Sequence, residues 1–408
     1  MQTQLSPEFR GDRDASEAEA ILRSCVHCGF CTATCPTYQL EGNELDGPRG
    51  RIYLIKQLLE GGEAGRSTQQ HLDRCLTCRN CETTCPSGVR YGKLVDIGRK
   101  LVDERVPRPA TERAARWLLK EGLTSPLVGP AVRLGQLVRP LLPQVLKRKL
   151  PARAPRRAAA PQVEHARKVM LLQGCVQPAM LPNINAATTR VLSAIGIQTV
   201  IAPEAGCCGA LRSHLSDHEG GLADMRRNID AWWPAVESGA VERIVINASG
   251  CGAVIKEYGD ALAHDPQYAE RAARISALSI DLSELLHEIV PALRAALPAG
   301  ARKVAVHTPC TLQHAQRLRG GVEAALADLG FTVKPPAAEA HLCCGSAGAY
   351  SVLNPGIATA LRDRKLKNLT APEPEVIVSA NIGCILHLQS GTDLPVKHWV
   401  ELIDQALA

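Results

Sequence analysis

Two cysteine motifs of the same form lie in the first quarter of the chain. Each reads C-x2-C-x2-C-x3-C-P; the cysteines are Cys25, Cys28, Cys31 and Cys35 in the first motif, and Cys75, Cys78, Cys81 and Cys85 in the second. Thiolates suit iron-sulfur clusters, and in bacterial ferredoxin motifs of this spacing the fourth cysteine ligates the other cluster of a pair. The spacing predicts two [4Fe-4S] clusters and a role in electron transfer.

Two other uses of clustered cysteines fit the sequence less well. Zinc also accepts four thiolates, but zinc sites usually pair two CxxC motifs across a longer gap. Disulfides belong to oxidising compartments, and the polar segment 1–19 lacks the apolar stretch of a signal peptide. No run approaches the ~18 uncharged apolar residues of a membrane span. We therefore expect a cytoplasmic protein with metal-bound thiols and no transmembrane segment.

A second group of eight cysteines lies in an internal repeat, with copies at residues 166–300 and 301–408. In each copy one cysteine follows an apolar strand, Cys-Cys-Gly follows a second strand, and a last cysteine follows a third. The cysteines are Cys175, Cys207, Cys208 and Cys251 in the first copy, and Cys310, Cys343, Cys344 and Cys384 in the second. Strand-helix-strand units build parallel α/β sheets, and their sites form at the carboxyl ends of the strands. We expect the thiols to converge there on a metal or cluster, since inert turn cysteines would hardly repeat in register.

The elements around the N-terminal motifs are expected to be helical. Apolar residues recur at helical spacing in 50–60, and helices are also expected at 16–24 and 93–102. Residues 1–104 are thus predicted to form a small all-α ferredoxin stabilised mainly by its clusters. Residues 105–165 form a connector, and residues 166–408 form the duplicated α/β domain.

The connector is strongly basic over residues 105–160, where only Glu112 and Glu121 are acidic. Nucleic acid is not the expected partner, because Trp117 is the single aromatic residue of the stretch and stacking residues are lacking. The mixture of basic and apolar residues suits short amphipathic helices on an anionic membrane surface, with Lys147, Arg148 and Lys149 contributing. A plain interdomain linker, extended over 151–161, is the alternative.

The motifs resemble those of a known family. The stretches CVHCGFCTATCPTYQL, ELDGPRGRIYLIKQ, HLDRCLTCRNCETTCPSGVRY, NIDAWWPA and HLCCGSAG are similar to glycolate oxidase iron-sulfur subunits. That family is related to the Cys-Cys-Gly subunits of anaerobic glycerol-3-phosphate dehydrogenase and heterodisulfide reductase, and to the lactate-utilisation iron-sulfur protein. The resemblance implies one cluster on Cys25, Cys28, Cys31 and Cys85, and another on Cys75, Cys78, Cys81 and Cys35. It also implies FAD-binding partner subunits that oxidise glycolate, and often D-lactate, with electrons passing toward membrane quinone from the inner face of the cell membrane.

One departure from the wider family affects the repeat. Its fullest motif ends in CxxC, but Val254 and His387 stand where the fifth thiol would be. Four thiols per copy can hold a further iron-sulfur cluster or zinc; His387 can add a ligand or only pack locally. A catalytic role like that of heterodisulfide reductase, service in a glycerol-3-phosphate or lactate dehydrogenase, and a zinc-stabilised docking platform are the alternatives. His307 is a candidate proton donor or a packed residue. We assign no catalytic residue to this chain and expect hydroxy-acid chemistry on a partner, because no G-x-G-x-x-G nucleotide motif is present.

Overall fold

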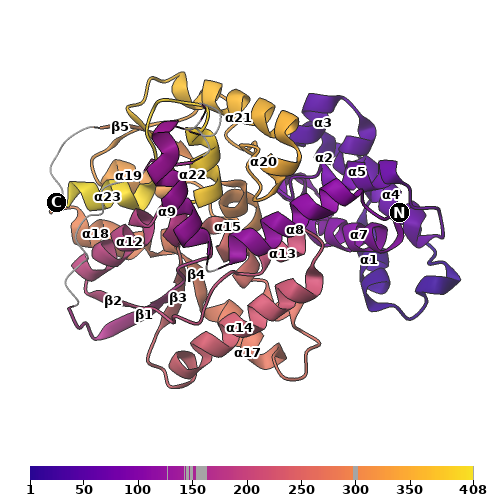
Figure 1. Cartoon of the computed structure of the whole chain (residues 1–408), viewed down its shortest axis with the longest axis horizontal. Helices are drawn as coiled ribbons and strands as arrows, with labels where there is room; N and C mark the ends of the chain where they lie inside the picture. The colour runs from indigo at the N-terminus through magenta and orange to yellow at the C-terminus, as the bar shows by residue number, and fades with distance from the viewer. Residues whose placement is uncertain are drawn as a thin grey trace. The chain divides into compact units, whose positions relative to one another are not determined.

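The computed structural model describes residues 1–125, 127–141, 143, 147, 150–152, 163–296 and 302–407 (Figure 1). Two compact units are formed. The first unit comprises Met1–Arg116 and His341–Leu361, and the second comprises Trp117–Ala340 and Arg362–Ala408. A short segment from the second repeat copy therefore belongs to the same unit as the N-terminal cysteine motifs.

The first unit is helical, as the sequence predicts. Its main helices are α1 (Arg13–Ser24), α2 (Phe30–Ala33), α3 (Pro36–Glu41), α4 (Pro48–Leu59), α5 (Arg66–Asp73), α6 (Asn80–Thr84), α7 (Tyr91–Arg105) and, from the inserted segment, α20 (Tyr350–Leu353). The side chain of Asp12 caps α1 by accepting a hydrogen bond from the Ala15 backbone N–H at 2.7 Å. Helices α1, α4 and α7 contribute the buried Leu22, Ile55 and Leu94 to one apolar core. That core also contains cysteines of both motifs, so the helices position the thiols directly.

Gly50 permits a close approach that shapes this unit. A Cβ atom at residue 50 would lie 2.2 Å from the carbonyl oxygen of Glu44, so only glycine fits. The short turn η2 (Glu44–Asp46) therefore lies against α4. This contact brings Asp46, which is fully buried, toward the interior of the unit.

The second unit contains two parallel four-stranded sheets with equivalent topology. One has the order β2-β1-β3-β4, with β1 (Arg167–Leu171), β2 (Ile197–Val200), β3 (Arg243–Ile246) and β4 (Ser279–Asp281); the other has the order β6-β5-β7-β8, with β5 (Lys303–His307), β6 (Thr332–Lys334), β7 (Val376–Ser379) and β8 (Val396–His398). The duplicated α/β fold is confirmed. Strands β4 and β8 were not predicted, because three residues at a sheet edge carry too little periodicity to detect.

Helices follow the strands and cover the sheets. They include α12 (Asn183–Ala194), α14 (His218–Glu237), α15 (Ser249–Ile255) and α17 (Ala269–Leu278) in the first copy, and α19 (Gly321–Asp328), α21 (Pro355–Thr370), α22 (Ile382–Gln389) and α23 (Trp399–Ala406) in the second. Trp232 of α14 and Tyr258 are fully buried within the core that covers the first sheet. The rigid sheets fix the chain at the strand ends, where the repeat cysteines occur.

The described part of the connector includes the helices α8 (Ala110–Thr124) and α9 (Val128–Val138). The mixture of basic and apolar residues suggested helices in this stretch. Arg148, Lys149 and most of the predicted linker 151–161 lie outside the described residues. Within the part of the chain that the structure describes, every helix is too short or too polar to cross a bilayer.

Candidate metal centres

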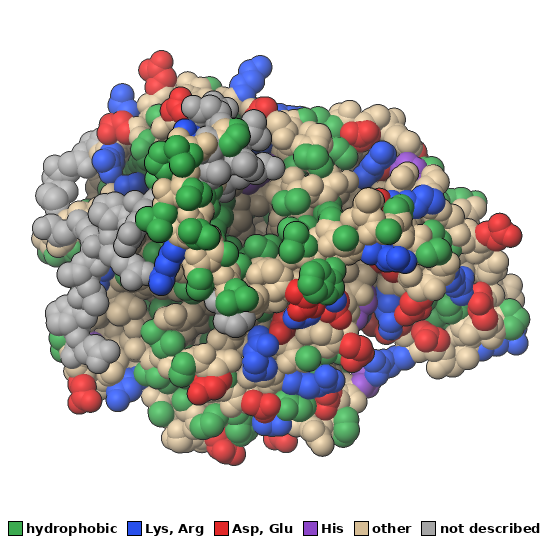
Figure 2. All heavy atoms as spheres, in the orientation of Figure 1, with side chains coloured by type: hydrophobic (Ala, Val, Ile, Leu, Met, Phe, Trp, Pro, Cys, Tyr) green, Lys and Arg blue, Asp and Glu red, His purple; other side chains and the backbone are tan. Residues whose placement is uncertain are grey.

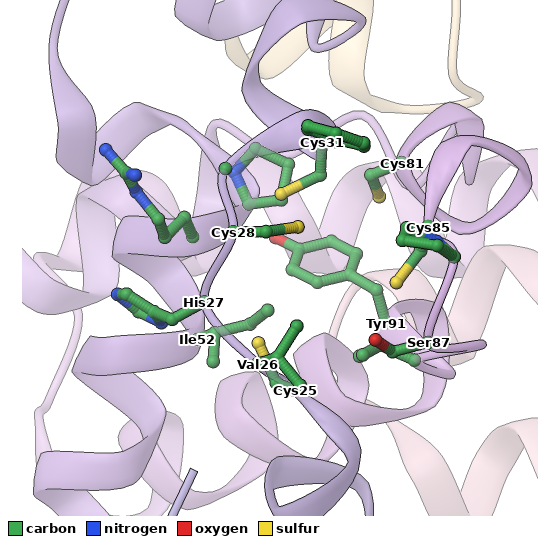
Figure 3. Close-up of a pocket in the computed structure, with 16 residues that line it drawn as sticks. Cys25, Val26, His27, Cys28, Cys31, Ile52, Cys81, Cys85, Ser87 and Tyr91 are labelled. Carbon is green, nitrogen blue, oxygen red and sulfur yellow. The ribbon is translucent and has the colours of Figure 1, made fainter.

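Five cysteines from the two N-terminal motifs line one cavity in the first unit: Cys25, Cys28, Cys31, Cys81 and Cys85. The charges that act on Cys31 come from Cys25, Cys85 and Cys28, so the last cysteine of the second motif joins three from the first. In Figure 3 the sulfur atoms of Cys28, Cys31 and Cys85 point toward a common central space, with Cys25 at its edge. We call Cys25, Cys28, Cys31 and Cys85 the first thiol set. Its membership matches the cluster that the resemblance implies.

The remaining N-terminal thiols gather around Cys81. The electrostatic neighbours of Cys81 include Cys78, Cys75 and Cys35. We call Cys75, Cys78, Cys81 and Cys35 the second thiol set. Cys35, Cys75 and Cys81 are buried, whereas Cys28 of the first thiol set is exposed. Each thiol set therefore combines three cysteines of one motif with the fourth cysteine of the other. The first thiol set lies nearer to solvent than the second.

Both sets have the electrostatics expected of a site that needs a cation. Burial, together with the charges of Cys25, Cys85 and Cys28, raises the pKa of Cys31 to about 11. Burial and neighbouring thiols also raise the pKa of Cys81 well above its ordinary value. Four thiolates at such spacing repel one another unless positive metal ions offset their charge. Each set therefore fits an iron-sulfur cluster, which supplies that charge and accepts one electron at a time.

A buried ion pair lies beside the second thiol set, and sequence reasoning missed it. Arg51 is 1% exposed and Asp46 is fully buried, with Nη2 of Arg51 3.6 Å from Oδ1 of Asp46. Asp46 also accepts from Nδ1 of His71 and from Arg74, each at 2.9 Å. A signal was available in the sequence: Arg51 stands one helical turn before Ile55, on the predicted apolar face of α4.

The Cys-Cys-Gly loop of the second repeat copy lies in the first unit. The Tyr350 hydroxyl donates to the carbonyl oxygen of Arg74 at 3.0 Å, next to Cys75 in the chain. Burial raises the pKa of Tyr350, and the charges of Cys75 and Cys343 act in the same direction. Cys343 therefore lies in the same electrostatic neighbourhood as a cysteine of the second thiol set.

The glycine of each Cys-Cys-Gly turn has a left-handed backbone conformation. Gly209 has φ +89°, and Gly345 has φ +88°. A Cβ atom would meet the carbonyl oxygen of Gly221 at 2.7 Å in the first copy and that of Ala358 at 2.5 Å in the second. These glycines therefore allow both the left-handed backbone and the close approach to α14 in the first copy and to α21 in the second.

The four thiols of the first copy come together in the second unit. Cys207 is hydrogen bonded to Cys175 and Cys208, and Cys208 is also bonded to Cys251. Bonds from Cys175 and Cys208 lower the pKa of Cys207, while the bond to Cys207, together with burial, raises the pKa of Cys175. Cys207 is thus the thiol most easily deprotonated, whereas Cys175 and Cys208 are held in the protonated form. The positive charge of a bound metal ion would favour thiolates at those positions too.

A polar network supports this first-copy turn from behind. The Asn228 side chain accepts from the Gly206 N–H and donates to the Cys207 carbonyl oxygen, both at 2.8 Å. The Tyr258 hydroxyl donates to the Cys208 carbonyl oxygen at 2.9 Å. Because these backbone groups are satisfied by buried side chains, the network stabilises this conformation of the turn.

The second-copy cysteines are divided between the two units. Cys310 follows β5 and Cys384 lies on α22, both in the second unit, whereas Cys343 and Cys344 belong to the first. The Asn381 side chain donates to the Cys384 sulfur at 3.5 Å, and the Gly345 N–H donates to the Cys343 sulfur at 3.4 Å. Their joint ligation of one metal stays a prediction.

Three residues near the repeat cysteines bear on the chemistry. Nδ1 of buried His307 lies 2.9 Å from the Ser379 hydroxyl, and burial, followed by the charge of Lys365, lowers its pKa to about 3. His307 is therefore neutral at ordinary pH, which favours a packing role over proton donation. Val254 packs against the first-copy core, consistent with a four-thiol site in that copy. His387 lies on α22, and ligation by it stays a prediction.

The fold and thiol sets define a class of protein: a two-cluster ferredoxin joined to a duplicated cysteine-rich domain. Residues 21–89 match the family described as 4Fe-4S dicluster domain, and residues 169–256 and 304–389 match the family described as cysteine-rich domain. The protein therefore carries iron-sulfur clusters.

Comparison with curated relatives places the chain in a narrower family. It is 55% identical over 412 residues to the glycolate oxidase iron-sulfur subunit of Escherichia coli K12, covering 100% of this chain and 99% of that protein. It is 32% identical to the probable glycolate oxidase iron-sulfur subunit of Bacillus subtilis 168, covering 96% and 92%. Lactate utilization protein A of Exiguobacterium is 25% identical over 59% of this chain and 98% of its own length. The chain belongs to the family of glycolate oxidase iron-sulfur subunits.

Proposed function

We propose that this chain is the electron-transfer subunit of a flavin-dependent glycolate oxidase, which converts glycolate to glyoxylate and also accepts D-lactate. The observation that carries the proposal is the presence of two separate four-thiol sets within one helical unit. Eight thiols arranged in this way suit two one-electron carriers held close together. A protein that only needed a stabilising zinc would not require two such sets.

The oxidation of the hydroxy acid is assigned to a partner that binds FAD. Removing a hydride from a 2-hydroxy acid requires an organic acceptor such as flavin, whereas iron-sulfur clusters accept single electrons. The sequence has no dinucleotide motif, and buried His307 is neutral and hydrogen bonded to Ser379, which argues against its acting on a substrate. In this proposal the chain takes electrons from the flavin one at a time.

We propose an order for the electron path within the first unit. The first thiol set is the entry point because Cys28 is exposed and its neighbours Val26 and Phe30 are 68% and 61% exposed. The buried second thiol set comes next. The loop with Cys343 and Cys344 follows, since Tyr350 is influenced by both Cys75 and Cys343. The Cys-Cys-Gly repeats hold either a further iron-sulfur cluster or zinc in this proposal. Electrons continue into the repeats if they hold a cluster, whereas the path ends before them if they hold zinc, which is not redox-active.

An anaerobic reduction experiment tests the function. The full complex would be purified from its own host, and glycolate added while the cluster absorbance is followed. Bleaching by glycolate, with no reaction when the isolated chain receives glycolate, is the expected result. Turnover of glycolate by the isolated chain would refute the assignment to a partner. Bleaching only by glycerol 3-phosphate or by another hydroxy acid would keep the electron-transfer role and change the substrate.

A role at the membrane rests on exposed apolar residues of the connector helices. On α8, Trp117 and Leu118 are more than half exposed, as are Leu134 and Leu137 on α9. Figure 2 shows hydrophobic side chains gathered over α9. We propose that this surface rests on anionic lipid at the inner face of the membrane and that quinone is the final acceptor.

Vesicle flotation tests the membrane role. A Leu134→Ser, Leu137→Ser double variant should lose most of its binding to anionic vesicles, and neutralising Lys147, Arg148 and Lys149 should weaken binding at physiological salt. Ile201→Ser, at another exposed apolar position, is the matched control and should bind as the native protein does. Unchanged flotation of both multiple variants would contradict lipid binding by the connector.

A further inference from the structure

Arg51, on α4, is a cation that is almost completely buried. It is 1% exposed, and its Nε donates to the His71 carbonyl oxygen at 2.7 Å while Nη1 donates to Thr37 Oγ1 at 3.2 Å. Nη2 has no hydrogen-bond partner among the residues that the structure describes. Its nearest anion, Asp46, is 3.6 Å away. Burying a guanidinium with an unused donor is costly, so a further negative group nearby would account for it.

Thiolates of the second thiol set can supply that negative charge. Thr37 Oγ1, which accepts from Arg51, lies 3.3 Å from the Cys35 sulfur. Burial lowers the pKa of the guanidinium, but Tyr91, Cys75 and Cys35 raise it more, so the net change is upward. Arg51 therefore carries a permanent positive charge close to two thiols of one set, each from a different cysteine motif.

We propose that Arg51 is a positioning residue whose fixed charge raises the reduction potential of the cluster held by the second thiol set. The proposal rests on the two-cluster assignment made above. Each reduction adds one electron to the cluster, and a cation in a low-dielectric surrounding stabilises the added charge. Local charge and hydrogen bonds to the sulfur atoms are among the means by which a protein sets this potential.

Asp46 allows a second test of the proposal, because its negative charge should affect the reduction potential of the same cluster in the opposite direction to the charge of Arg51. Its carboxylate is fully buried and contacts Arg51, His71 and Arg74. Removing the cation should lower the potential of the second cluster, whereas removing the anion should raise it. If the ion pair only stabilised the fold, removing either residue would destabilise the first unit without shifting the reduction potential of the second cluster in opposite directions.

Redox titration of the intact protein, followed by electron paramagnetic resonance, tests this. The full chain with its clusters would be titrated with a chemical reductant, so the result does not depend on glycolate. Arg51→Met should make reduction of the second cluster about tenfold less favourable, which is about 59 mV for one electron. Asp46→Asn should shift the same cluster in the opposite direction. Both variants should leave the first cluster near its native potential.

Two further variants serve as controls. Arg51→Lys keeps the charge and should stay near the native potential. Arg49→Gln removes a partly exposed arginine that lines the first cavity and pairs with Glu44 at 2.6 Å. It should affect the first cluster weakly and the second not at all, because solvent screens its charge.

The outcomes separate the proposals. Shifts of the same sign in Arg51→Met and Asp46→Asn, or no shift in either, would overturn the role of Arg51. If Arg51→Met loses its second cluster, the absence of an upward shift in Asp46→Asn would overturn it instead. A native protein that shows only one cluster signal would refute the two-cluster assignment on which the proposal rests.

Discussion

The Tyr350 hydroxyl donates a hydrogen bond to the Arg74 carbonyl oxygen, and this bond joins residues 276 positions apart in the chain. Nearby, the Asn80 side chain donates to the His341 carbonyl oxygen at 3.5 Å and to that of Thr34 at 2.9 Å. The segment with the second Cys-Cys-Gly turn is thereby tied to both N-terminal cysteine motifs. These hydrogen bonds hold Cys343 close enough to the second thiol set that Cys343 and Cys75 both raise the pKa of Tyr350.

Tyr350→Phe should loosen this segment without unfolding the protein. The variant loses one partly buried hydrogen bond, which typically contributes about 1 kcal/mol. Hydrogen exchange in residues 341–361 should therefore become roughly fivefold faster. Tyr53→Phe, at an exposed position of α4, is the control and should exchange as the native protein does. Equal protection in Tyr350→Phe and the native protein would show that the bond does not hold the segment.

Serine variants of the fourth cysteines test the exchange between motifs. Cys85→Ser should disturb the same paramagnetic signal as Cys25→Ser, because the charges of both residues act on Cys31 of the first thiol set. Cys35→Ser should instead disturb the signal that Cys75→Ser disturbs. Grouping by motif, with Cys85→Ser resembling Cys75→Ser, would contradict the thiol sets found in the fold.

The metal content of the intact protein tests the repeat cysteines. Two [4Fe-4S] clusters account for about eight irons per chain. Further iron that is lost in a Cys207→Ser, Cys208→Ser double variant would assign a cluster to the first copy. Zinc lost in that same variant would assign a zinc site there. Unchanged iron and zinc in the double variant would refute metal binding by these thiols.

Removal of the clusters should unfold the first unit selectively. Its core includes Cys25, Cys75 and Cys81, so the cavity left by each cluster lies within the small apolar core itself. The second unit has a separate core around Trp232 and Tyr258 and should persist. Hydrogen exchange after anaerobic chelation should rise over residues 1–105 but not over the strands β1 and β3. Uniform protection of both units after iron loss would contradict this.

Acid should destabilise the second unit through a buried histidine. Burial lowers the pKa of His398 to about 3, whereas an unfolded histidine titrates near 6.5. Between these values the unfolded state binds more protons, so stability is complete above pH 6.5 and falls as the pH is lowered toward 3. The loss can reach about 1.4 kcal/mol per pH unit for one such group.

His398→Ser isolates this contribution. Nδ1 of His398 accepts from the Val400 N–H at 3.1 Å and caps α23, and a serine hydroxyl can replace that cap. Denaturant unfolding of the second unit should depend less steeply on pH between 6.5 and 3 in this variant. An identical slope in the native protein would show that His398 is not the proton-binding group.

Local sequence determined much of this protein. The spacing of Cys25, Cys28 and Cys31 indicates a cluster-binding turn because short spacers limit where the sulfur atoms can lie. The helices near residues 16–24 and 50–60 were predicted from apolar periodicity, and the parallel sheets from repeated strand-helix units. The positive φ of Gly209 and Gly345 follows from the same local chemistry. Each of these properties depends on residues close together in the chain.

Only the tertiary structure decided which distant residues meet. No local pattern reveals that Cys343 belongs to the unit of Cys75, or that Asp46 is the buried partner of Arg51 beside one thiol set. Such contacts depend on how helices and loops pack, and packing is set by many weak apolar contacts summed over the whole core. The sequence therefore determined the kind of cofactor and the expected grouping of the N-terminal thiols, whereas the fold decided which other residues and charges surround them.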